Sequence, residues 1–201
     1  MKQQIYALIA ISLLTFCTCK NCIDSKTSKN FNFDISLISK DENNLGKAEI
    51  IIKIIDKKRN EEIQKISFMS EFILKSESFK NGKNNKSYPS NTHLISIEND
   101  FGDLIVADLN FDGKEDIAIK REEGGNGGPL YNYYIQSESY QFVLDEYLSN
   151  EMIYFPDYID NKGKSLHVTV RANSLTKEGV NYHYDKFNNV WSKSRSEIFN
   201  Q

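Results

Sequence analysis

Cysteine is nearly absent from this sequence: the chain has 3 among 201 residues, and all of them lie at or before position 22. The remaining chain can therefore be neither a disulfide-stapled scaffold nor a cysteine-ligated metal centre. Proline, at 3, and glycine, at 10, are too few for a proline-rich or collagen-like chain. The 25 Lys and Arg are balanced by 28 Asp and Glu, which gives a net charge of −3. Because the chain has no basic excess, we expect no nucleic-acid partner.

Sequence patterns that carry catalysis are also missing. The histidines His93, His167 and His183 are far apart, and the chain has neither an HExxH pair nor a G-x-S-x-G elbow. The glycine-rich segment 124–128 lacks the Lys-Ser/Thr ending of a phosphate loop. We therefore predict that the protein is not an enzyme. Turnover of a cell-wall or surface glycan is the alternative.

A single long apolar run exists, and it lies at the N-terminus. The run Ile5–Phe16 follows the positive charge of Lys2. A membrane-spanning helix needs about 20 apolar residues, whereas a signal peptide needs roughly 7–15 after a basic start. The sequence therefore predicts a signal peptide over residues 1–18.

The predicted signal peptide ends in Phe16-Cys17-Thr18-Cys19. Bacterial lipoprotein signals end in small residues before a cysteine that becomes acylated. Thr18 precedes Cys19, whereas the bulky Phe16 precedes Cys17, so we predict lipidation at Cys19 in preference to Cys17. Residues 19–30 would then form a lipidated, polar tether on a bacterial cell envelope, facing the periplasm or the cell surface. Secretion without a lipid is the alternative.

The rest of the chain, residues 31–201, is predicted to form a single all-β domain. Apolar and polar residues alternate from Phe31 to Leu37, and a β-branched run at 48–56 followed by a strand at 62–69 predicts a hairpin. Further strands are expected at 104–107, 117–119, 131–136, 166–171, 180–184 and from Val190 onward, and 93–97 is another candidate. The segment 76–91 is expected to be a long loop, and 142–147 is expected to be a strand or one helical turn. No long amphipathic helix is evident, so we predict a propeller-like array, a sandwich or a barrel of antiparallel strands.

A calcium-loop pattern joins two of these strands. Side-chain oxygens occupy loop positions 1, 3, 5 and 9, at Asp108, Asn110, Asp112 and Asp116. Gly113 stands at position 6, where the chain must turn sharply, and Lys114 at position 7 would offer its backbone carbonyl. Ca²⁺ takes about 6–8 oxygen ligands at flexible geometry. The spacing therefore predicts one structural Ca²⁺ held by these residues.

The flanking residues distinguish this pattern from an EF-hand. Position 12 is Ile119 in place of the EF-hand Glu, and the segments LIVA and IAIK on either side have the composition of strands. We predict a strand–loop–strand site with Asp116 as the closing carboxylate. Three carboxylates would repel one another without a cation, which favours calcium over a metal-free Asx-rich turn. Mg²⁺ fits less well because it requires stricter octahedral geometry.

A glycine-rich segment follows the calcium-loop pattern. Four of the 10 glycines fall within 124–128, just before an aromatic cluster formed by Tyr131, Tyr133 and Tyr134. Such a hairpin can protrude and insert into a cleft, or it can connect flexibly into a core strand. Spacing alone does not choose between these two interpretations.

The runs LIVADLNFDGKEDIAIK and GNGGPLYNYYI together resemble a family of bacterial envelope lipoproteins with a single D-x-N-x-D-G calcium loop. Members of that family have a propeller-like all-β fold and act as immunity proteins, which inhibit lysozyme-like peptidoglycan hydrolases delivered through a secretion system. The loop is also similar to the FG-GAP repeats of integrin-type propellers. Those propellers carry several such loops, whereas this chain has one.

The resemblance implies a peptidoglycan hydrolase as the protein partner and a G-x-x-Y inhibitory loop. In this sequence Gly128 to Tyr131 matches that loop, with Gly128 letting it bend and Tyr131 entering the hydrolase cleft. Membrane contact would come from the N-terminal lipid alone. The alternative is a calcium-stabilised surface module that binds a glycan or a protein and has no enzyme target.

Overall fold

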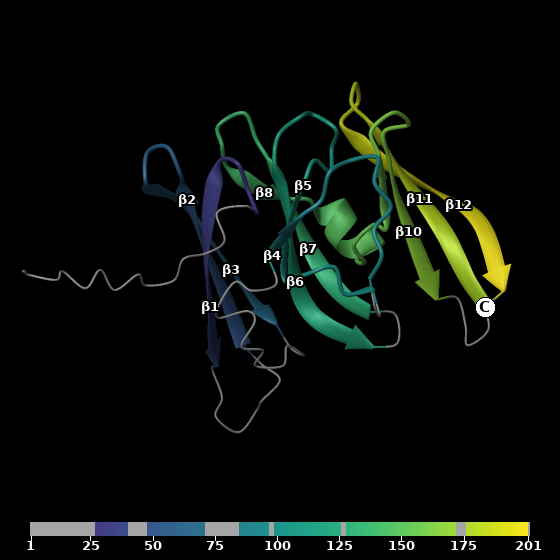
Figure 1. Ribbon diagram of the computed structural model, residues 1–201, viewed down its shortest axis with the longest axis horizontal. Coiled ribbons are helices and arrows are strands. Elements are labelled where there is room, and N and C mark those ends of the chain that lie inside the picture. Colours follow the sequence, from purple (N-terminus) through teal and green to yellow (C-terminus); the bar gives the residue numbers. More distant parts are fainter. Residues whose placement is uncertain are drawn as a thin grey trace, which may run out of the picture.

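The computed structural model describes residues 27–39, 48–70, 85–96, 99–125, 128–171 and 176–200 (Figure 1). The predicted signal peptide at 1–18 and the lipidation site at Cys19 lie outside these residues. Within the described ranges, no helix is long and apolar enough to cross a membrane.

Three sheets lie side by side in the order of the sequence (Figure 1). The first sheet contains β1 (Phe31–Ser39), β2 (Ala48–Asp56) and β3 (Glu61–Ser70). The middle sheet contains β4 (Asn85–Ser87), β5 (Leu104–Ala107), β6 (Asp116–Gly125), β7 (Gly128–Gln136) and β8 (Phe142–Leu144). The third contains β9 (Tyr158–Asp160), β10 (Ser165–Arg171), β11 (Thr176–Asp185) and β12 (Val190–Asn200). Between β8 and β9, a short π-helix, η2 (Leu148–Met152), packs near β7.

Burial of the middle sheet on both faces explains this layered arrangement. Successive side chains of a strand point to opposite faces. Leu104, Val106, Ile117 and Ile119 accordingly pack into a core shared with the first sheet, and Ile105, Ala107, Ala118, Tyr131 and Tyr133 pack into a second core shared with η2 and the third sheet. The central strands of the middle sheet are therefore apolar on both faces, while each outer sheet covers only one core.

The outer sheets show the alternation that the sequence predicts. Ile50, Ile52 and Ile54 of β2 are buried, whereas the residues between them are less so. The pairing between β1 and β2 is antiparallel and continuous from Phe31 with Asp56 to Ser39 with Ala48. Isoleucine suits such a ladder because its β-branched side chain packs well on a pleated surface.

The all-β prediction is confirmed, and the arrangement is sandwich-like, with no closed barrel among the described strands. The predicted strand at 48–56 matches β2, and the other predicted strands from 31 to 69, from 104 to 136 and from 166 onward are present, with β6 running on to Gly125. Two short strands were not predicted: β4 lies within the predicted loop 76–91, and β9 pairs with the start of β10. The segment 142–147 is a short strand followed by the start of a helical turn. Within the predicted candidate strand 93–97, His93 forms an isolated bridge with Tyr158.

Gln64 joins the first sheet to the edge of the middle sheet. Its Nε2 donates to the backbone carbonyl of Phe142 at 2.8 Å, and its Oε1 accepts from the Phe142 amide at 2.7 Å. The side-chain amide thus bonds to the backbone of β8 as a neighbouring strand would. This contact satisfies the backbone of a buried residue.

The variant Gln64→Ala tests this junction. It leaves the amide and the carbonyl of Phe142 without partners, and an unsatisfied buried group costs about 1–3 kcal/mol. We expect the free energy of unfolding, measured by urea denaturation, to fall by about 2 kcal/mol. Gln141→Ala, which removes one half-buried bond to the Ile63 carbonyl, is the matched control and should cost clearly less. A Gln64→Ala protein as stable as the wild type would show that these two bonds do not stabilise the contact between the sheets.

Candidate functional site

The loop between β5 and β6 has the backbone that the calcium-loop pattern requires. Gly113 has a φ of 88°, which confirms the sharp turn expected at position 6. Phe111 also has a positive φ, of 62°, and its ring lies under the ammonium of Lys164, 5.4 Å from the ring centroid. The turn 161–164 therefore packs beside this loop.

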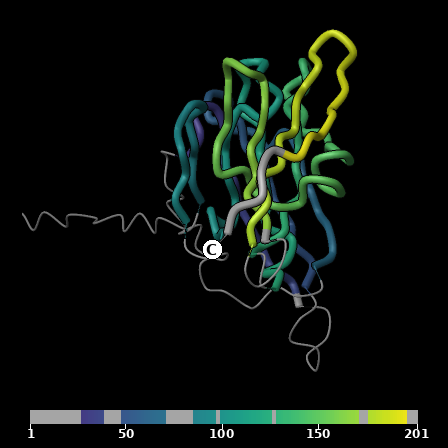
Figure 2. The backbone as a smooth tube through the Cα atoms, turned by 90° about the vertical axis from the view of Figure 1, so that its right-hand side faces the viewer, coloured from purple at the N-terminus to yellow at the C-terminus, as the bar shows by residue number. Residues whose placement is uncertain are grey.

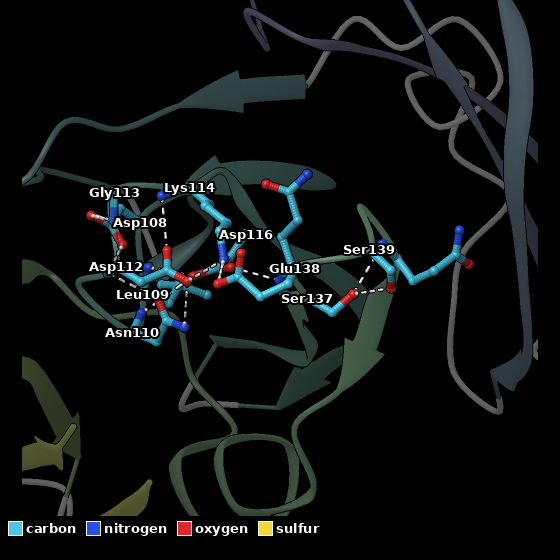
Figure 3. Close-up of polar contacts among 12 residues, drawn as sticks. Asp108, Leu109, Asn110, Asp112, Gly113, Lys114, Asp116, Ser137, Glu138 and Ser139 are labelled. Carbon is cyan, nitrogen blue, oxygen red and sulfur yellow. Dashed lines mark hydrogen bonds and ion pairs between the residues drawn. The ribbon is translucent and has the colours of Figure 1, made fainter. Parts of the chain in front are cut away.

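The side chains at positions 1, 3 and 5 converge inside the loop (Figure 3). Asp108 accepts from the amides of Asp112 at 3.0 Å and Gly113 at 3.1 Å. Asn110 Oδ1 accepts from the Asp112 amide at 3.1 Å, and Asp112 Oδ1 accepts from the Lys114 amide at 2.8 Å. Burial, and after it the negative charge of Asp112, raise the pKa of Asp108. The loop thus gathers three oxygen side chains around its own backbone.

Asp116 lies beneath the loop and is completely buried. One carboxylate oxygen accepts from the amides of Leu109 at 2.8 Å and Asn110 at 3.3 Å, and the other accepts from the Gln136 amide at 2.8 Å. Burial raises the pKa of Asp116 to about 7, although the three amide bonds act in the opposite direction. This carboxylate therefore ties the loop to the end of β7.

The donor chemistry of the loop fits a hard cation, but its arrangement fits the predicted ligand set only in part. Asp108, Asn110 and Asp112 supply the carboxylate and amide oxygens that Ca²⁺ prefers. Asp116, in contrast, directs both oxygens at backbone amides, and Lys114 places its ammonium 3.3 Å from Asp112 and 2.6 Å from Glu138. Within the described ranges, no three His, Cys, Asp or Glu side chains are grouped as a metal site. Positions 1, 3 and 5 are thus brought together, while Asp116 supports them from below.

Glu115 connects the same loop to the start of the domain. Its carboxylate accepts from the Ser28 hydroxyl at 2.8 Å, the Lys29 amide at 2.6 Å and the Asn30 amide at 3.2 Å. The chain therefore enters β1 beside the predicted calcium loop. Glu115 is not among the predicted site residues, because a carboxylate at position 8 has no place in the calcium pattern.

The structure contradicts the predicted role of Tyr131. Its side chain is 0% exposed, and its hydroxyl donates to the Gly102 carbonyl at 2.9 Å. Burial accordingly raises the pKa of Tyr131. A residue that enters the cleft of another protein must be accessible, so Tyr131 is a core residue and not an inhibitory plug.

The pairing of β6 with β7 gives the physical reason for this burial. Tyr131 lies opposite Lys120, and Tyr133 lies opposite Ala118, so both tyrosines face the second core. The glycines allow the two strands to approach closely at the tip: a Cβ on Gly124 would lie 2.0 Å from the Gly128 carbonyl oxygen. Gly128 is itself buried, with a φ of 98°. Gly124 and Gly128 therefore allow β6 and β7 to pair closely at this end of the hairpin.

The loop that projects furthest is the turn between β11 and β12 (yellow in Figures 1 and 2). Phe187 at its tip is 101% exposed. The Asp185 carboxylate accepts from the amides of Phe187 at 2.9 Å and Asn188 at 3.2 Å, and hydrogen bonds from Asn188 lower the pKa of Asp185. The turn is therefore fixed by its own side chains while it presents one aromatic ring. An aromatic residue in the middle of the polar run Asp185-Lys-Phe-Asn-Asn189 is the sequence signal that could have identified it.

No protein-family model matches this chain, and neither does any curated protein. A solved structure of a Xanthomonas protein described as related to a type IV secretion system is similar to it, with a TM-score of 0.47 and 15% sequence identity. The match covers 83% of this chain and 85% of the Xanthomonas chain. A match at this level does not identify a function.

Two tyrosine variants test the placement of Tyr131. Removing a large buried aromatic side chain costs about 3–5 kcal/mol, so Tyr131→Ala should lower the free energy of unfolding by that amount. Tyr140→Ala, at an exposed turn, should change it by less than about 0.5 kcal/mol. Urea denaturation of both variants measures the difference. Equal stability of the two variants would contradict the burial of Tyr131.

Proposed function

We propose that this protein is a lipid-anchored, calcium-stabilised inhibitor of a lysozyme-like peptidoglycan hydrolase in a bacterial envelope. The observation that carries the proposal is the fixed, projecting turn between β11 and β12, which presents a fully exposed Phe187. The sequence resemblance supplies the class of target. In this proposal Phe187 replaces Tyr131 as the residue that enters the hydrolase cleft, and the protein acts by excluding substrate without any chemistry of its own.

Phe187 has the properties of a binding anchor. Binding energy at protein interfaces is concentrated in a few residues, often aromatic, that fill pockets on the partner. A turn that is already ordered loses little conformational entropy on binding, which favours affinity. The bonds from Asp185 to the amides of the turn supply that order. Burial of this ring by a partner would be favourable, because it would remove apolar surface from water.

Calcium would stabilise the neighbouring edge of the molecule. Asp108, Asn110 and Asp112 would hold the ion together with the carbonyl of Lys114, and Asp116 would contribute its negative charge from beneath. The ion would neutralise carboxylates whose pKa values burial raises. Because Glu115 holds residues 28–30, the same ion would also fix the place where the predicted lipid tether joins the domain.

Thermal melting in Ca²⁺ and in chelator tests the metal. A ligand at 100 times its Kd stabilises by about 2.7 kcal/mol, so the wild type should melt several degrees higher in Ca²⁺. Asp112→Ala should lose this calcium-dependent shift. Glu62→Ala, which removes an exposed carboxylate on β3, should keep it. If the wild type melts at the same temperature in Ca²⁺ and in chelator, the calcium proposal is refuted.

Inhibition of peptidoglycan lysis tests the anchor. Against a lysozyme-like hydrolase that the wild type inhibits, we expect Phe187→Ala to weaken inhibition at least 30-fold, since an anchor residue contributes about 2 kcal/mol or more. Ile95→Ala is the matched control, because Ile95 is equally exposed on another loop. If both variants inhibit as well as the wild type does, the turn is not the inhibitory element.

A further inference from the structure

A pocket of about 260 Å³ lies next to the turn of the β11–β12 hairpin, beside the loop that follows β5. It is lined by Asn110, Ile135, Ser137, Val143, Leu144, Asp145, Tyr184, Asn189 and Trp191. These residues come from the calcium-loop region, from β7 and β8, and from both strands of the hairpin. Phe187 is in the same turn as Asn189 but is not one of the lining residues.

Two packed aromatic rings form one wall of this pocket. The rings of Tyr184 and Trp191 have centroids 4.8 Å apart and an interplanar angle of 43°. The Trp191 indole donates to Asp145 at 3.0 Å, and the Tyr184 hydroxyl donates to the Asn189 side-chain oxygen. Asp145 in turn accepts from the Leu148 amide at 2.9 Å. The aromatic wall is therefore held in place before any ligand arrives.

The remaining lining combines short polar groups with an exposed apolar rim. The side-chain amide of Asn189 and the hydroxyl of Ser137 offer hydrogen bonds, whereas the Asn110 amide already bonds to Asp112. The Asn189 Oδ1 accepts from Tyr184, so its Nδ2 is the group that would donate to a ligand. Val143 is 57% exposed and Leu144 38% exposed. No Lys or Arg lines the pocket, and Asp145 is negative, which disfavours an anionic ligand.

We propose that this pocket binds a saccharide chain that carries N-acetyl groups. A pyranose ring offers an apolar face of C–H groups to an aromatic wall and hydroxyl groups to amides around it. The acetyl methyl group would pack on Val143 and on Ile135, which lies opposite it in the sheet, and the acetyl carbonyl would accept from the Asn189 Nδ2. Aromatic walls with a few placed polar groups are the usual composition of small-ligand sites.

This site goes beyond the inhibition of a hydrolase. It shares Asn110 with the predicted calcium loop, but Phe187, the proposed anchor, does not line it. Saccharide binding would hold the domain against an N-acetylated glycan, whereas Phe187 would contact a protein. The two proposals therefore fail independently, because a variant at the tip leaves the pocket lining unchanged.

Trp191 is the single tryptophan of the chain, so a change in tryptophan fluorescence reports on this pocket. We would titrate the full-length protein with an N-acetylglucosamine trimer and follow the tryptophan fluorescence, with calorimetry on the same samples. A saturable change with 1:1 stoichiometry is expected. Cellotriose, which has the same backbone without N-acetyl groups, should bind at least tenfold more weakly.

Matched variants locate the binding. Asn189 has a φ of 55°, so Asn189→Gly removes the amide while suiting the backbone. Asn189→Gly and Val143→Ala should each weaken binding of the trimer about tenfold, which corresponds to 1.4 kcal/mol, while circular dichroism shows that both variants are folded. Phe187→Ala should bind the trimer as the wild type does. Absence of saturable heat and fluorescence change, equal binding of cellotriose, or full binding by Asn189→Gly would each overturn the proposal.

Discussion

The carboxylate of Asp116 fixes the edge of the molecule on which the candidate sites depend. It is completely buried, and its bonds to the amides of Leu109, Asn110 and Gln136 join the start of the loop to the end of β7. A buried carboxylate requires such partners because it has lost its hydration. Once this junction is set, Glu115 holds the entering chain, and Asp108 and Asp112 close the loop above it. The β11–β12 hairpin and its pocket then lie against a fixed support.

Burial of the middle sheet on both faces is the second constraint. The first core requires the β1–β3 sheet, and the second requires η2 and the β9–β12 sheet. The faces of β7 are consequently covered, so a partner can reach the middle sheet through its turns and edges. Figure 1 shows these turns together at one edge, with the β11–β12 turn projecting furthest. Binding by turns on a rigid β scaffold is a common arrangement.

Local patterns in the sequence predicted local structure well. The β-branched run at 48–56 is β2, and Gly113 has the positive φ that its place in the loop requires. Tyr131 was misinterpreted because the glycines before it are typical of a projecting loop as well as of a close hairpin. Its ring packs on Phe155 and its hydroxyl bonds to Gly102, which is 29 positions away in sequence, and no local pattern reports such packing. The pocket at Trp191 was missed for the same reason, since β8 and the β11–β12 hairpin form it together.

We propose that this edge binds a peptidoglycan hydrolase when calcium is present. The most direct measurement uses the full-length protein as bait for envelope and secreted extracts, once in Ca²⁺ and once in chelator, with mass spectrometry of the retained proteins. The account predicts stoichiometric retention of a lysozyme-like hydrolase in Ca²⁺ and a clear loss of it in chelator. Retention of no hydrolase in either condition would contradict the account.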